Sequence, residues 1–275
     1  MGKFEGILFC TDLDGTLLRS DKSVSRENLE AIEYFKSEGG RFTFVTGRMP
    51  FYVGDIFCVV HPNAPIGCVN GGGIYDFDSS RYVWCEELAR GAFDLVDAVD
   101  AEIPGMGIQI STFHHAYFSR DNSAMQHFRE VTNLPNLSTH WYDVDEPVAK
   151  VIFGDTDESR LVRVMEILAA HPLAKDYGFI RSERTLYEIL PKGINKGSCL
   201  YGIAEAVGTD IAHTVAIGDY DNDIEMIRKA GVGVAVANAR ESVKAVADYV
   251  TVSNEEHAIA RVIADIEAGK ITFPG

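Results

Sequence analysis

The sequence predicts an α/β fold in which a parallel-sheet core is interrupted by an inserted α+β module. In residues 1–81, and again after residue 186, short apolar runs alternate with helix-like segments, which is typical of parallel βαβ units. Between these two stretches, helix-like and strand-like segments follow one another in a mixed order. We therefore expect a discontinuous core, residues 1–81 and 186–275, that carries an inserted domain, residues 82–185.

The first core segment is expected to contain three strands, at residues 6–11, 41–45 and 66–69. Ser25 can cap a helix between the first two strands, where apolar residues recur at helical spacing until a pair of glycines ends the pattern. Pro50 suits the first turn of a short helix after the second strand.

The other two segments differ from each other in the order of their elements. In the inserted module, helices are predicted at residues 86–101, 122–131 and 158–171, and strands at residues 106–111, 116–118, 149–154 and 177–181. In the second core segment, strands are predicted at residues 186–190, 213–217 and 232–236, and helices at residues 195–207, 221–229, 241–247 and 255–266.

The charge balance limits the possible partners. Lys and Arg number 25 against 41 Asp and Glu, so the formal net charge is −16. Such an acidic chain is not expected to bind nucleic acid or an anionic membrane surface. A small anionic substrate would have to be attracted locally, by a metal ion or a few basic side chains.

Cysteine usage and hydropathy indicate the compartment. The five cysteines contain no CxxC pair, so free thiols in a reducing environment are expected. We find no signal-peptide pattern and no apolar run near the ~20 residues that span a bilayer. These observations predict a cytoplasmic protein without a membrane segment. Nothing in the sequence indicates an interface, so the oligomeric state stays open.

A pair of carboxylates follows the first predicted strand, in the run Asp12-Leu13-Asp14-Gly15-Thr16. Residues two apart in a strand point to the same side, so both carboxylates are expected to converge at one strand end. Gly15 allows the backbone to turn away steeply. Such a pair can form a metal site together with a nucleophile or a proton carrier.

Other polar residues occupy equivalent positions. Thr46 and Asp219 each follow a predicted strand, and in doubly wound parallel sheets the site lies beyond the carboxyl ends of the strands. Lys196 opens a helix, where backbone N–H groups favour an anion. Together these groups would bind a hard divalent cation and a phosphate.

With these motifs the chain resembles the haloacid dehalogenase superfamily of phosphohydrolases, in particular its Cof-type branch with a large α/β cap. The matching segments are residues 12–18, 45–48, 70–72, 192–197, 218–226 and 238–251. They cover both core segments in the family's order, whereas the inserted module matches only in length and mixed character. The resemblance implies a Rossmann-like core with an inserted α+β cap that sets substrate specificity.

The resemblance also implies catalytic roles. Asp12 would attack phosphorus and form an aspartyl-phosphate, and Asp14 would protonate the leaving oxygen and then activate water. Mg²⁺ would be held by the carboxylates of Asp12 and Asp219 and by the backbone carbonyl of Asp14. The implied reaction is Mg²⁺-dependent hydrolysis of a small phosphorylated metabolite, with sugar phosphates as the leading class.

A further set of residues would bind the phosphate group or support the site. The implied phosphate-binding groups are Thr46, Lys196, Asn222 and the backbone N–H groups of Leu13 and Gly47. Asp223 would orient Lys196 or a metal-bound water, and the remaining supporting residues are Arg48, Asn70 and Gly71. The family often has glycine where Tyr220 stands, and a tyrosine there is expected to narrow the site.

Two other functions and several roles remain open. The chain could pass phosphate from Asp12 to a sugar, as a phosphotransferase or mutase, or it could be a phosphometabolite sensor without activity. The intact set of catalytic residues argues against a sensor. In the inserted module, residues 140–142 either line a substrate pocket or pack the domain, Arg181 and Arg184 could meet a second anion, and residues 143–146 are expected to form a solvated loop.

Overall fold

The computed structural model describes residues 2–274 and separates into two compact units. The first unit combines the chain up to Cys85 with the chain from Asn195 onward, and the second consists of Glu86–Ile194. The mixed α/β fold class with a parallel-sheet core and additional sheets is confirmed.

The first unit is built on a parallel sheet with the strand order β13-β12-β11-β1-β2. Its strands are β1 (Leu8–Thr11), β2 (Arg41–Phe44), β11 (Thr214–Gly218), β12 (Val232–Ala235) and β13 (Tyr249–Val250). Strand β1 lies between β11 and β2, and both pairings are parallel. The carboxyl ends of these three strands therefore meet at one edge, although the loops that follow them are far apart in sequence.

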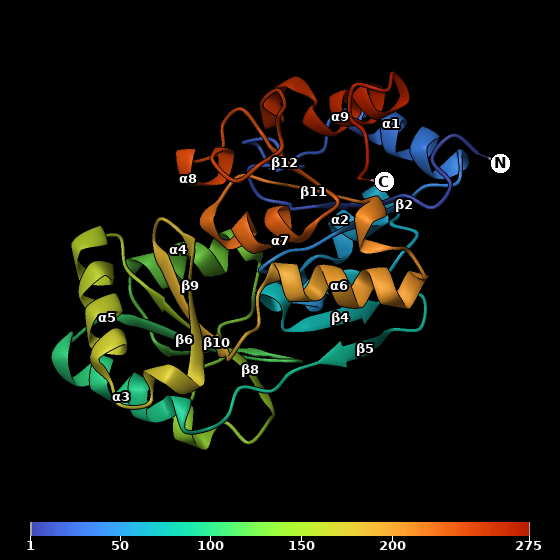
Figure 1. Cartoon of the computed structure of the whole chain (residues 1–275). Coiled ribbons are helices and arrows are strands. Elements are labelled where there is room, and N and C mark those ends of the chain that lie inside the picture. The colour runs from blue at the N-terminus through green and yellow to red at the C-terminus, as the bar shows by residue number, and fades with distance from the viewer. Residues whose placement is uncertain (1, 275) are drawn as a thin grey trace. The chain divides into compact units, whose positions relative to one another are not determined.

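Helices cover both faces of this sheet, as Figure 1 shows. Cys10 packs with buried residues of α6 (Lys196–Val207) and α7 (Ile224–Lys229), whereas the ring of its neighbour Phe9 meets Phe35 of α1 (Arg26–Ser37). This alternation follows from the period of two in a strand. The other helices of the unit are α2 (Gly54–Val60), α8 (Glu241–Lys244) and α9 (Ala258–Glu267), which packs against α1.

A small antiparallel sheet extends the first unit, with the order β3-β4-β5. It contains β3 (Ile66–Cys68), β4 (Gly73–Asp76) and β5 (Arg81–Cys85), and an isolated bridge joins Val45 to Gly67. The sequence predicted β3 but not the hairpin β4–β5. That hairpin starts in a glycine run and its last strand is largely exposed, so the apolar signal of a strand is weak there.

The second unit contains an antiparallel sheet with the order β7-β6-β8-β10-β9. Its strands are β6 (Gly107–Thr112), β7 (Ala116–Arg120), β8 (Val148–Gly154), β9 (Tyr177–Glu183) and β10 (Leu186–Pro191). Helices α3 (Ala92–Glu102) and α5 (Glu158–Ala170) pack on one face of this sheet, around residues such as Val151 and Ile189. The remaining helix is α4 (Ser123–Thr132), which contacts β6.

The strand predicted at residues 186–190 does not belong to the parallel core. It is β10, which pairs antiparallel with both β8 and β9, and the division between the units falls after Ile194. All residues of β10 are buried, so the segment has the apolar character of a parallel-sheet strand. Only the pairing partners distinguish the two cases, and they are distant in sequence.

Most other predicted elements lie within a few residues of observed ones, but α3 begins later than expected. Residues 86–91 precede it without helical structure, and the backbone N–H of Leu88 donates to the carbonyl of Val148 at 2.7 Å. Among residues 2–274, the helices are too short or too polar to cross a bilayer.

Candidate active site

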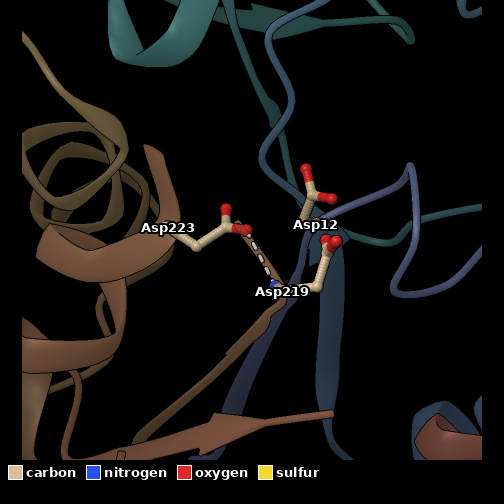
Figure 2. A group of neighbouring side chains, drawn as sticks. All are labelled: Asp12, Asp219 and Asp223. Atoms are coloured by element: carbon tan, nitrogen blue, oxygen red, sulfur yellow. Dashed lines mark hydrogen bonds between the residues drawn. The ribbon is translucent and has the colours of Figure 1, made fainter. Parts of the chain in front are cut away.

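Three aspartates gather beyond the carboxyl ends of the central strands of the first unit (Figure 2). Asp12 follows β1 and Asp219 follows β11, and Asp223 lies in the 3-10 turn Asp221–Asp223 after β11. One carboxylate oxygen from each aspartate lies within 4.8 Å of the others. The parallel pairing of β1 with β11 brings Asp12 and Asp219 together, and the backbone N–H of Asp12 donates to the carbonyl of Ile217 at 2.9 Å.

Lys196 inserts a positive charge into this cluster. Its Nζ donates to Asp12 and, at 2.6 Å, to Asp223 Oδ1, and its side chain is 1% exposed. Lys196 is the first residue of α6, and Asn195 and Ser198 form a reciprocal capping box there. The cap sets where the helix begins and therefore where the lysine leaves it.

Asp223 also organises the loop that bears Asp219. Its Oδ2 accepts hydrogen bonds from the backbone N–H groups of Asp219 and Tyr220, at 3.0 and 3.1 Å, and Figure 2 shows the first of these. Thr16 donates its hydroxyl to Asp219 Oδ1 at 2.9 Å. The position of Asp219 is thus defined from two sides, by the backbone and by its carboxylate.

The cluster holds more negative than positive charge. Burial, and then the nearby carboxylates Asp223 and Asp219, raise the pKa of Asp12 against the opposing effect of Lys196. Burial and Asp223 likewise raise the pKa of Asp219 to about 7. For Lys196, burial alone would lower the pKa, but the charges of Asp12 and Asp223 outweigh burial and raise it. The lysine is therefore a permanent cation surrounded by carboxylates that are costly to ionise together.

The donor set fits a magnesium ion. Every acidic ligand in the cluster offers oxygen, which Mg²⁺ prefers, and a divalent cation would offset the surplus negative charge. The excess of carboxylates over cations within 4.8 Å is the observation that favours a metal over a purely structural ion pair.

Asp14 lies near this cluster but its carboxylate is bound elsewhere. Arg48 donates from Nε to Oδ2 at 2.9 Å and from Nη2 to Oδ1 at 2.7 Å, and Lys22 donates to Oδ1 at 2.8 Å. Burial would raise the pKa of Asp14, but Arg48 and then Lys22 outweigh it and hold the pKa below its usual value. Asp12 and Asp14 both lie beyond β1, which ends at Thr11, so the strand period of two does not set their directions, and Asp14 still acts electrostatically on Asp12 and Asp219.

Sequence reasoning missed Lys22 and Thr16. Lys22 occupies a left-handed turn conformation, with φ 65°, and no motif distinguishes it. Thr16 was visible inside the run of residues 12–16, but its contact with Asp219 spans most of the chain. Local spacing in the sequence did not predict that Lys22 would pair with Asp14 or that Thr16 would pair with Asp219.

The predicted phosphate-binding side chains Thr46, Lys196 and Asn222 are all buried. Thr46 follows β2 and is 1% exposed, and its hydroxyl accepts a hydrogen bond from the backbone N–H of Arg48 at 3.2 Å. Asn222 is buried and donates to Asn70 Oδ1 at 3.0 Å. The side chain of Leu13 is fully buried in the core. The phosphate-binding roles of these residues, and of the N–H groups of Leu13 and Gly47, stay predictions.

Arg240 packs on the ring of Tyr220 and is itself held by Asp221. The guanidinium of Arg240 lies over the tyrosine ring, 4.9 Å from the ring centre, and the same arginine pairs with Asp221 at 2.7 Å. These contacts give the tyrosine a defined orientation where the family often has glycine.

In the second unit, Trp141 packs inside the domain, whereas His140 and Tyr142 are exposed. Trp141 is buried and donates to Asp97 Oδ1 at 2.9 Å, and Tyr142 donates to Asp97 Oδ2 at 2.8 Å. Arg181 pairs with Glu158 at 2.8 Å, and Arg184 pairs with the same carboxylate at 3.2 Å. Each arginine thus has an acidic partner.

The prediction of a solvated loop at residues 143–146 is wrong for Glu146. This carboxylate accepts hydrogen bonds from Thr112 at 2.7 Å and Tyr117 at 2.6 Å, and lies 2.8 Å from His115 Nδ1. Glu146 therefore ties the loop to the hairpin β6–β7.

Comparison with known proteins assigns the family. A family model described as haloacid dehalogenase-like hydrolase matches residues 9–263, so the chain belongs to this family of hydrolases. This confirms the family prediction and the prediction of a hydrolytic enzyme.

The similar proteins include phosphatases. The putative phosphatase YxeH of Bacillus subtilis is 29% identical over 96% of this chain and 99% of its own length. The 5-amino-6-(5-phospho-D-ribitylamino)uracil phosphatase YwtE of the same organism is 28% identical, over 94% of this chain and 97% of its own. A haloacid dehalogenase-like hydrolase from Bacteroides thetaiotaomicron has a solved structure that superposes with a TM-score of 0.83 at 28% identity, covering 94% of this chain and 99% of that one.

Proposed function

We propose that this chain is a Mg²⁺-dependent phosphatase that hydrolyses small phosphomonoesters, sugar phosphates foremost, through an aspartyl-phosphate. The main support is the buried cluster of Asp12, Asp219 and Asp223 around Lys196, together with a separately held carboxylate, Asp14. A structural ion pair would need only one carboxylate for each lysine. This site contains several carboxylates and keeps two of them in different electrostatic environments.

Asp12 and Asp219, with the backbone carbonyl of Asp14, would hold the metal ion. When bound, Mg²⁺ neutralises part of the negative charge of the carboxylates and of the phosphoryl group. Thr16 and Asp223 would keep Asp219 in place for this role, through the hydrogen bonds that each makes to that residue.

Asp12 would act as the nucleophile. Its carboxylate oxygen forms a bond to phosphorus while the bond between phosphorus and the ester oxygen breaks, and the leaving oxygen takes a proton from Asp14. In the second step Asp14 takes a proton from water as the water attacks the phosphorylated aspartate. That attack releases phosphate and restores Asp12. The pKa of Asp14, held low by Arg48 and Lys22 against its burial, favours the ionised form that acts as base in the second step, whereas donating a proton in the first step would require these two contacts to loosen.

Lys196, Thr46 and Asn222 would bind the oxygens of the phosphoryl group. Lys196 is already positioned by Asp12 and Asp223, so little reorganisation is needed when the substrate binds. Fixed donors of this kind stabilise the charge of the transition state more than that of the ground state.

The second unit would select the rest of the substrate, as a cap domain. On the sheet face opposite α3 and α5, Lys150 donates to Glu188 at 2.9 Å and both side chains are 2% exposed. Gln109 and Ser111 are buried on the same face, and Gln109 Oε1 and Ser111 Oγ have no hydrogen-bond partner. Such a mixture of donors and acceptors suits hydroxyl groups. A relative named for a phosphorylated ribityl compound fits the same chemistry, since a ribityl chain is a polyol.

Phosphate release from p-nitrophenyl phosphate and a panel of sugar and polyol phosphates tests this proposal. We expect turnover with Mg²⁺, none with EDTA, and a loss of at least about 10⁴-fold in Asp12→Asn. Asp78→Asn, which makes the same change at an exposed turn aspartate, is the matched control and should keep wild-type activity. Mass spectrometry after acid quenching should find phosphate on Asp12. Activity retained in Asp12→Asn would contradict the mechanism.

A further inference from the structure

Three consecutive residues beside the site have positive φ angles. Val69 has φ 58°, Asn70 has φ 52° and Gly71 has φ 102°. Glycine adopts this region easily and asparagine tolerates it, but a β-branched valine there is a genuine outlier. All three residues are buried. Such a strained run persists only where its surroundings favour it, and it often marks a functional site.

The run contacts the loop that follows β2. The backbone N–H of Asn70 donates to the carbonyl of Thr46 at 3.1 Å, and that of Val69 donates to the carbonyl of Arg48 at 3.1 Å. The side-chain amide of Asn70 packs against Gly47, where an added Cβ would lie 2.9 Å from Asn70 Oδ1. Residues 69 and 70 therefore bind both ends of the segment Thr46–Arg48.

The same run contacts two other parts of the site. Asn70 Oδ1 accepts the hydrogen bond of Asn222 at 3.0 Å. Gly71 lies directly against the start of α6, since an added Cβ would lie 2.1 Å from the carbonyl oxygen of Asn195 and 3.0 Å from the backbone nitrogen of Lys196. Only a glycine at residue 71 permits this approach.

Three segments with predicted phosphate-binding residues thus meet at one strained turn. They come from positions 46–48, 195–196 and 222, which are widely separated in the sequence. We propose that Asn70 is a positioning residue, whose side chain sets the distance between the Thr46–Gly47 loop and Asn222 so that both bind one phosphate group. Preorganised donors avoid the cost of reorienting when the anion binds. The inference rests on the proposed function only in taking phosphate as the ligand.

The test is binding of inorganic phosphate in the presence of Mg²⁺, measured by calorimetry and as inhibition of p-nitrophenyl phosphate hydrolysis. Asn70→Gly keeps a residue that tolerates the left-handed backbone but removes the amide. We expect the dissociation constant for phosphate to rise about tenfold, in keeping with the loss of a buried hydrogen bond, and kcat to fall by a similar factor. Asn133→Gly is the matched control, because Asn133 has the same φ of 52° at the end of α4, and its phosphate affinity should not change.

A second variant disturbs the same contact without changing residue 70. In Gly47→Ala the new methyl group would push against the Asn70 amide, so phosphate binding should weaken as in Asn70→Gly. In the double variant Gly47→Ala/Asn70→Gly the methyl group has room. Its phosphate affinity should therefore be no lower than that of Asn70→Gly alone.

These outcomes separate the positioning role from the proposed function. Wild-type phosphate affinity in both single variants, or additive losses in the double variant, would overturn the positioning role. If Asn70→Gly does not fold, unchanged phosphate affinity in Gly47→Ala would overturn it. A wild-type chain that binds phosphate but turns over no phosphomonoester would overturn the proposed function and leave the positioning role intact.

Discussion

Each of the two units contains a buried lysine, and the two lysines have different surroundings. Lys196 in the first unit is 1% exposed and pairs with Asp12 and Asp223, and Asp219 lies within the same cluster. Lys150 in the second unit is 2% exposed and pairs with Glu188 at 2.9 Å. Lys196 is thus outnumbered by the carboxylates of its cluster, whereas Lys150 and Glu188 bring one charge of each sign.

This difference indicates what each place can bind. A surplus of negative charge in a buried site is stabilised by a bound cation. That cation, together with the lysine, can then bind an anion such as phosphate. The Lys150–Glu188 pair brings one charge of each sign, and the hydrogen-bonding groups of Gln109 and Ser111 on the same sheet face suit neutral hydroxyl groups. Because buried ion pairs are weak contributors to stability, neither lysine is explained by stability alone.

Among the predictions from this comparison, we expect the largest effect when Lys196 is replaced. In Lys196→Met the carboxylates lose their cation, and one fixed donor to the phosphoryl group disappears. We expect kcat to fall by about 10²–10³-fold. Lys229→Met, on the neighbouring helix α7, is the control and should stay near wild-type activity. A kcat for Lys196→Met within threefold of wild type would show that the lysine has no part in the reaction.

Metal binding should depend on pH because the same cluster must lose a proton. In the metal-free site the pKa of Asp219 is raised to about 7, chiefly by burial and then by Asp223. Below pH 7 a proton competes with Mg²⁺ for this carboxylate, so the affinity for Mg²⁺ should fall about tenfold per pH unit. Titration of activity and of the melting temperature with Mg²⁺ at pH 6, 7 and 8 measures this. Equal Mg²⁺ affinity at pH 6 and 8 would contradict the assignment of Asp219.

The second lysine should affect the choice of substrate and stability, not the chemistry. Lys150→Met leaves Glu188 buried without its cation and should cost about 3–5 kcal/mol in the free energy of unfolding, measured with urea. Lys150→Met/Glu188→Leu should recover most of that loss.

In the double variant we expect unchanged turnover of p-nitrophenyl phosphate and a KM for sugar phosphates raised about tenfold, as for a lost hydrogen bond to the substrate. A sugar-phosphate KM equal to that of wild type would refute a role in recognition.

The smallest effect is expected at Lys22, the exposed member of the pair of cations on Asp14. Its side chain is 52% exposed, against 17% for Arg48, and exposed ion pairs contribute little. Lys22→Met should lower kcat/KM by no more than about threefold and leave the melting temperature unchanged. Arg48→Met, which removes two hydrogen bonds to Asp14, should lower kcat/KM more than Lys22→Met does. The opposite order would mean that Lys22 contacts the substrate.

Local patterns were enough to predict most elements and the motifs of the first unit, but not its hairpin β4–β5. The Ser25 side chain caps α1 by accepting from the backbone N–H of Asn28, and α6 begins at Lys196, the residue predicted to open a helix. The same patterns predicted that Asp12, Asp219 and Lys196 follow strands or open a helix. Because parallel strands end at a common edge, these positions were sufficient to predict that the three residues meet.

The pairing of strands and of charged side chains depends on contacts between distant parts of the chain, so only the tertiary structure decided it. The strand Leu186–Pro191 joins the antiparallel sheet because β8 and β9 are its neighbours, which its own residues do not reveal. Asp14 pairs with Arg48, 34 residues away, although both Asp12 and Asp14 follow the same strand. By itself, the sequence determined which segments are helices and strands and which groups stand at their ends, because caps, periodicity and turns act over a few residues. The pairing of strands and of buried charges was decided by tertiary structure, because each pair minimises a free energy shared between residues that are remote in the chain.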